Sequence, residues 1–237
     1  WSHHLDLAYS DPIPRKTPVV VTYSFAKGGM LDDYFAAPGA SFTKFTKAQQ
    51  ANFKKALKVY EAATAVKFVE VDGVGMINAA AGHDTGQRGY ANYPTTNWPL
   101  GYFGQLMIDG DTDFAPGTRD FRLMLHEIGH AMGLSHSADG TFTLAGDLDN
   151  LKNTVMTYNL PGGASITTKL GKLDHKALAY LYGDASGTKG WNVSTKGDAV
   201  KIVASNRGET RTAILQESGL LLKDLMTHTL AKDAQHE

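Results

Sequence analysis

Residues 126–136 read His-Glu-Ile-Gly-His-Ala-Met-Gly-Leu-Ser-His. They belong to a longer segment, 119–134, whose apolar residues recur at helical spacing. Because side chains four positions apart lie on one face of a helix, His126 and His130 can bind a single metal ion. Glu127 then stands beside the ion rather than binding it, and its carboxylate can take a proton from water there.

Gly133 follows His130 by three residues, where a left-handed residue ends a helix and glycine adopts that conformation without steric cost. The turn can bring His136 to the same ion. Three imidazoles leave one position of a tetrahedral zinc ion open, as catalytic zinc sites do. The alternative is that unrelated histidines share this spacing, a coincidence expected in roughly a few of 100,000 such sequences. The sequence therefore predicts one catalytic Zn²⁺ held by His126, His130 and His136.

Composition limits the function classes further. The chain has 237 residues and no cysteine, which excludes disulfides, iron–sulfur clusters and thiolate zinc sites. With 23 Lys and Arg against 24 Asp and Glu, the net charge of −1 argues against a nucleic-acid partner. No apolar run approaches the roughly 20 residues of a membrane span, and the first residues do not resemble a signal peptide.

The elements around the histidine motif alternate between strands and helices. Thr46 and Gln49 form a capping box, which predicts an amphipathic helix over about 46–65. A third helix is predicted over 173–182, stopped by Gly183. About forty residues of loop separate it from the second helix, and such a long loop is usually functional or held by ligands. Strands are predicted at 19–25, 67–71, 76–80, 88–93 and 102–109.

These elements suggest three regions of the chain. Residues 1–18 are proline-rich and predict an extended arm, and 19–185 form the main domain. Residues 186–237 form a C-terminal extension of unknown role, with a hairpin at 199–204 and 209–215 and a helix at 220–232. The extension is expected to pack on its own domain, or alternatively to engage a partner or shield the site.

The motif HEIGHAMGLSH resembles the elongated zinc signature of the metzincin endopeptidases, HExxHxxGxxH. Residues 155–158, Val-Met-Thr-Tyr, are similar to the Met-turn of that family. Within it the likeness is closest to the serralysin-like secreted bacterial proteases and covers about 19–183. Residues 22–25 are similar to the first strand of these proteases, and residues 86–91 are similar to the strand above their cleft. Residues 173–183 are similar to their closing helix. The chain departs from that group in Ser137, where proline is usual, and in lacking glycine–aspartate calcium repeats.

The resemblance implies an α+β fold with a twisted mixed sheet, two long helices, a loop-rich lower half and a closing helix. It implies a secreted zinc endopeptidase that acts on proteins or peptides, in which Glu127 activates a zinc-bound water. It places Met156 beneath the histidines, and makes Tyr158 a zinc ligand or a hydrogen-bond donor to the transition state.

Two acidic segments are weaker candidates, for Ca²⁺. Asp109, Asp111 and Asp113 alternate along one loop, and 147–150 carry Asp, Asp and Asn in another, but neither completes an EF-hand. Solvated loop carboxylates are the simpler interpretation of both. A structural zinc at His83 and Asp84 lacks the family's spacing.

Two other functions remain open from the sequence. One is an interaction protein on a metzincin scaffold with an occluded or self-inhibited cleft, and the other is a hydrolase of non-peptide amides. Retention of Glu127, Tyr158 and all three histidines argues against the first, because a binding module needs none of them. Cleavage of a random peptide library would distinguish the endopeptidase from these two alternatives.

Overall fold

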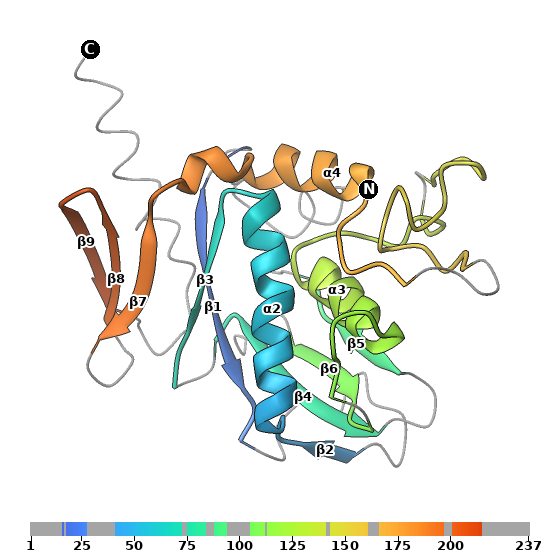
Figure 1. Ribbon diagram of the computed structural model, residues 1–237, viewed down its shortest axis with the longest axis horizontal. Helices are drawn as coiled ribbons and strands as arrows, with labels where there is room; N and C mark the ends of the chain where they lie inside the picture. The colour runs from blue at the N-terminus through green and yellow to red at the C-terminus, as the bar shows by residue number, and fades with distance from the viewer. Residues whose placement is uncertain are drawn as a thin grey trace.

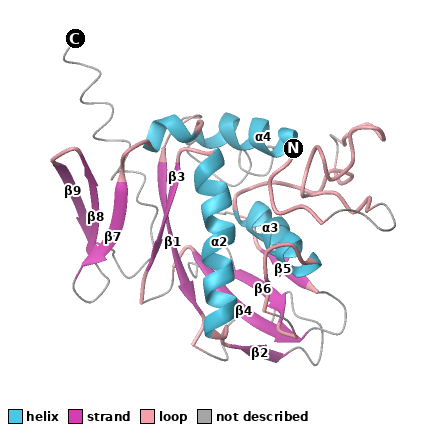
Figure 2. Ribbon diagram, in the orientation of Figure 1, coloured by secondary structure: helices cyan, strands magenta, loops and turns pink. Residues whose placement is uncertain are grey.

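The computed structural model describes residues 16, 18–27, 41–72, 75–83, 88–93, 105–111, 113–140, 143–160, 166–196 and 201–214. Within them the protein is mixed α/β, with a six-stranded mixed sheet, three α-helices and a separate three-stranded sheet (Figures 1 and 2). None of the described helices combines the length and apolar character that crossing a bilayer requires.

The main sheet consists of β-branched and apolar segments in the order β3-β1-β4-β6-β5, with β2 beside β4. Neighbours along β3-β1-β4-β6 are parallel, whereas β5 and β2 run antiparallel to their partners. β5 therefore forms one edge of this sheet and β3 the other. The strands are β1 (Val19–Phe25), β2 (Ser41–Thr43), β3 (Val66–Glu70), β4 (Ile77–His83), β5 (Gly89–Ala91) and β6 (Gln105–Asp109).

Helix α2 (Lys47–Ala63) confirms the predicted capping box. Thr46 Oγ1 accepts from the Gln49 backbone N–H, and the Gln49 side chain accepts from the Thr46 N–H. These bonds satisfy two donors that a helix start leaves without partners. The buried face of α2 carries Phe53, Leu57 and Tyr60, as its apolar spacing indicates.

Helix α3 (Arg119–Ala131) carries the histidine motif and packs with α2 on the same face of the sheet (Figure 1). Leu125, Ile128 and Met132 are buried, and Leu123 packs against the core from a half-buried position. The helix is three residues shorter than the 119–134 that its periodicity suggests. It ends early because the chain reverses at Gly133, while Leu134 still packs in the core.

Helix α4 (Lys172–Tyr182) and the short 3₁₀ turn η1 (Ala185–Thr188) follow the long loop, and Figure 1 shows α4 lying across the ends of α2 and the sheet. The predicted hairpin is confirmed as β8 (Lys201–Asn206) and β9 (Glu209–Ile214). A strand that the sequence did not indicate, β7 (Asn192–Lys196), pairs with β8 and contacts β3. The helix predicted at 220–232 lies outside the described residues.

Candidate metal centre

The end of α3 is built to turn the chain back toward its own histidines. Gly133 has φ of 90°, a left-handed conformation that glycine adopts without strain. The Gly133 N–H donates to the His130 carbonyl and the Leu134 N–H to the Gly129 carbonyl, which together form a Schellman motif. The predicted helix stop is confirmed, and the chain beyond it returns His136 to the helix.

The three histidines meet through their Nε2 atoms. His130 Nε2 lies 3.1 Å from His126 Nε2 and 3.0 Å from His136 Nε2. Zinc–nitrogen bonds of about 2.0–2.1 Å in tetrahedral geometry separate ligand atoms by about 3.3 Å. The observed spacing is close to that value, so the three histidines can bind one metal ion.

Each imidazole is oriented by a hydrogen bond from its other nitrogen. A proton on Nδ1 leaves Nε2 as a lone pair directed toward the other two rings, the tautomer that a metal ligand needs. The Nδ1 partners are the Val155 carbonyl for His126 (2.9 Å), the Leu134 carbonyl for His130 (2.7 Å) and the Asp139 carboxylate for His136 (2.6 Å).

With all three Nδ1 atoms donating, none of the three converging Nε2 acceptors carries a proton of its own. Lone pairs about 3 Å apart repel, and a cation is the partner that makes such an arrangement favourable. Burial, together with the neighbouring His130, lowers the pKa of His126 to about 3, so the ring is neutral at pH 7. The donor set therefore fits a divalent metal that accepts imidazole nitrogen.

Glu127 follows the ligand His126 on α3 and is buried. Within the described part of the chain its Oε2 has no hydrogen-bond partner. Burial raises the pKa of Glu127 to about 8, while the charge of Arg122 acts in the opposite direction. A carboxylate in such surroundings gains a proton readily, as a general base must.

The edge strand β5 passes next to Glu127. A Cβ on Gly89 would lie 3.1 Å from Glu127 Oε1 and 3.2 Å from its Cγ, tighter than most side-chain contacts. Glycine at this position therefore leaves room for the carboxylate. The strand edge and the histidine cluster form one site.

Tyr158 approaches the cluster from the loop beyond Met156. Its hydroxyl lies 2.6 Å from His136 Nε2, and the two rings are 4.5 Å apart. The side chain is 64% exposed, so it can move without disturbing the core. Its phenol can reach the metal position or a molecule bound there.

No family model matches this chain.

The loop 153–157 forms the floor of the site. A Cβ on Gly129 would lie only 2.6 Å from Met156 Sδ, so the thioether packs against α3 between the two helical histidines. Asp174 of α4 fixes this loop by accepting from Thr154 Oγ1 at 2.6 Å and from the Val155 N–H at 2.8 Å. The floor is thus tied to both α3 and α4.

Four residues near the site were not singled out from the sequence. Tyr93 packs its ring edge-on against His130 at 5.3 Å. Arg122 lies one helical turn before His126, and helical spacing alone would have indicated it. Asp139 and Asp174 act through hydrogen bonds whose partners the sequence does not reveal, although Asp139 follows His136 by only three residues.

The two acidic segments considered for Ca²⁺ differ in the contacts that their side chains form. Asp109 and Asp111 come together with His83, whose ring nitrogens lie 3.4 and 3.5 Å from their carboxylates. In the other segment, Asp149 accepts from Ser137 and the Asn150 amide donates to the Asp147 carbonyl. The hydrogen bonds of Asp149 and Asn150 thus hold the loop itself.

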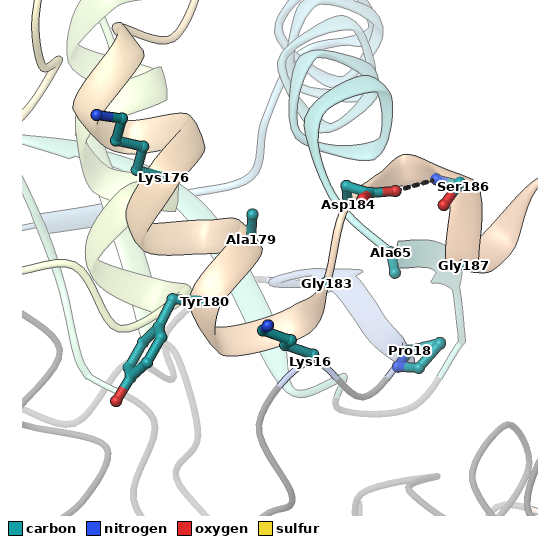
Figure 3. Close-up of a pocket in the computed structure, with 10 residues that line it drawn as sticks. All are labelled: Lys16, Pro18, Ala65, Lys176, Ala179, Tyr180, Gly183, Asp184, Ser186 and Gly187. Atoms are coloured by element: carbon teal, nitrogen blue, oxygen red, sulfur yellow. Dashed lines mark hydrogen bonds between the residues drawn. The ribbon is translucent and has the colours of Figure 1, made fainter.

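A separate hollow of about 550 Å³ opens beside the end of α4 (Figure 3). Its lining includes Lys16, Lys176 and Tyr180, but none of the three histidines. Figure 3 shows the Asp184 carboxylate at the start of η1, where it accepts a hydrogen bond from the Ser186 N–H. This hollow is distinct from the metal centre.

Proposed function

We propose that the protein is a zinc-dependent endopeptidase of the metzincin type, closest to the serralysin-like enzymes. The observation that carries the proposal is the convergence of three Nε2 acceptors, each fixed by its own Nδ1 bond, beside a buried carboxylate. A zinc ion held by His126, His130 and His136 would supply Lewis acidity toward a carbonyl group and a water molecule.

Glu127 is the general base in this proposal. Its carboxylate takes a proton from the attacking water and delivers it to the nitrogen of the leaving amine, so that the peptide bond breaks without a charged amide leaving group. The buried surroundings of Glu127 favour its protonated form, which supports the second step. An ionised carboxylate is needed for the first step, and the nearby charge of Arg122 supports it.

Tyr158 is the hydrogen-bond donor to the oxygen on which negative charge develops. Partial burial, with the nearby carboxylates of Glu127 and Asp139, raises the pKa of Tyr158 above its usual value of 10, so the phenol keeps its proton at neutral pH. One well-placed donor of this kind lowers an acyl-transfer barrier by about 3 kcal/mol.

The edge of β5 is the proposed binding strand for the substrate. Among the described strands β5 pairs only with β6, so its other edge can pair with an extended peptide. Because Gly89 lies against Glu127, such a peptide would run past the carboxylate.

The test is cleavage of a random peptide library by the zinc-loaded protein and by its Glu127→Gln and Glu127→Ala variants. We expect cleavage by the wild type and a loss of about 10²–10⁴-fold in kcat for both variants, with zinc content unchanged. Glu70→Gln is the control, because Glu70 is exposed on β3. Comparable turnover by a zinc-replete Glu127 variant would exclude this mechanism.

A further inference from the structure

Arg122 is a half-buried cation on the same face of α3 as the metal ligand His126. The two positions are four apart, so the side chains are neighbours along the helix. The Nη1 atom of Arg122 is buried, and among the described residues it has no hydrogen-bond partner. A buried guanidinium nitrogen without a partner is costly, which points to a partner that comes with a ligand.

The acidic residues around Arg122 do not fill that role. Asp120, two residues earlier, accepts from Arg88 at 2.6 Å. Glu127 and Tyr158 both interact electrostatically with Arg122, yet in the described part of the chain neither forms an ion pair or hydrogen bond with it. The guanidinium thus lies close enough to the proposed base and donor to feel their charges, and it keeps hydrogen-bonding capacity unused.

A carboxylate is the chemical group best suited to accept hydrogen bonds from the Arg122 guanidinium. Guanidinium and carboxylate form short, charge-assisted and often bidentate hydrogen bonds. A neutral side chain that cannot accept a hydrogen bond there would leave the buried Nη1 atom unpaired. Sites that leave a buried polar group unpaired discriminate strongly between ligands.

We propose that Arg122 selects substrates with a carboxylate beside the scissile bond, supplied by an Asp or Glu side chain. This inference rests on the proposed peptidase function. Arg122 is a specificity residue here and neither gives nor takes a proton itself, although its charge favours the ionised form of Glu127.

The experiment uses one cleavable peptide scaffold in which single positions on either side of the scissile bond carry Asp or Glu, or the neutral isosteres Asn or Gln. A further arm compares free with amidated C-termini, which separates a side-chain carboxylate from a terminal one. Each peptide is tested for kcat/KM with wild type, and for equilibrium binding to zinc-loaded Glu127→Ala by fluorescence anisotropy, which needs no turnover.

We expect one position to prefer the acid over its amide by at least tenfold in both measurements. Arg122→Gln should abolish that preference and Arg122→Lys should keep part of it. Arg119→Gln is the matched control, because Arg119 is exposed on the same helix, and it should leave the preference intact.

The outcomes separate the two proposals. Cleavage without an acidic preference, or with a preference that Arg122→Gln retains, overturns the role of Arg122 and leaves the peptidase standing. A preference only for a free C-terminus overturns the side-chain assignment. Arg122-dependent binding of acidic peptides without any cleavage supports the carboxylate site and counts against the peptidase.

Discussion

At the scale of single residues, the three histidines are oriented by two kinds of hydrogen-bond acceptor, main-chain carbonyls and a side-chain carboxylate. His126 and His130 donate to main-chain carbonyls, which no substitution of a side chain removes directly. His136 alone depends on a side chain, the carboxylate of Asp139, which is itself largely exposed. The third ligand is therefore the one whose orientation a point mutation can release.

Asp139→Ala should weaken zinc binding by about 10–100-fold, because it removes the acceptor that fixes the His136 ring and its tautomer. Asp139→Asn should lose less, since its amide oxygen can still accept from Nδ1. Competition with a chromophoric chelator measures the affinity. Asp147→Ala is the control, an exposed aspartate of the same loop, and an unchanged affinity in Asp139→Ala would show that the ring is held by other contacts.

At the scale of elements, Asp174 joins the start of α4 to the floor of the metal centre. It accepts from the Gly171 N–H at 2.8 Å as part of the helix cap, and from Thr154 and Val155 in the loop. The carbonyl oxygen of Val155, in turn, accepts from His126 Nδ1. One buried carboxyl thus connects a helix end, the floor and a metal ligand.

The burial of Asp174 has a consequence for stability against pH. Burial raises its pKa from 3.8 to about 6, although hydrogen bonds from Thr154, Val155 and Gly171 act to lower it. Because the folded pKa lies above the unfolded one, the stabilising contribution is complete below pH 3.8 and is lost as pH rises through about 6. Raising the pH across this window should therefore destabilise the protein through this group.

We expect the free energy of unfolding of wild type, relative to Asp174→Asn, to fall by about 2 kcal/mol between pH 4 and pH 7. Urea denaturation of both proteins in metal-free form measures the difference without a contribution from metal release. Asp174→Ala should cost about 2–4 kcal/mol at either pH, because it leaves two buried N–H groups without acceptors. A difference that rises with pH would mean that the three hydrogen bonds outweigh burial.

The elements themselves were predictable where one local rule decided them. The capping box at Thr46 and the helix stop at Gly133 depend on residues within one turn, and both are confirmed. Strand β2 has only three residues, and β7 reads Asn-Val-Ser-Thr-Lys, so neither carries the apolar alternation that marks a strand.

The candidate site likewise has a part that a local sequence pattern predicts and a part that it does not. The spacing in 126–136 was enough to bring three histidines together, because a helix and a tight turn fix their relative positions. The contact of Gly89 with Glu127 and that of Asp174 with Val155 join residues 38 and 19 positions apart. Such contacts depend on how the sheet and helices pack, which no local pattern specifies.

At the scale of the whole molecule, the metal centre and the three-stranded sheet lie at opposite edges of the main sheet. Gly89 of β5 contacts Glu127, whereas β7 contacts β3. The order β3-β1-β4-β6-β5 places four strand spacings between these edges, or about 19 Å. Residues 192–196 are therefore positioned to cover the β3 edge and not the metal centre. This position argues against β7 as the segment that would occlude a self-inhibited cleft.

Truncation after Gly190 tests this arrangement. We expect zinc affinity and kcat/KM for a library-derived peptide to stay within twofold of wild type, because β7 lies at the far edge. The melting temperature should fall by about 5–10 °C, since the buried side chain of Trp191 is lost and each kcal/mol shifts it by about 2–4 °C. The uncovered β3 edge should also promote self-association, measured by light scattering. A second truncation after Ile214 keeps β7–β9 and separates their contribution to the melting temperature from that of the residues beyond. A rise in kcat/KM in either variant would instead show that the C-terminal residues restrict access to the site, because only an obstruction relieved by their removal increases turnover without altering the metal ligands.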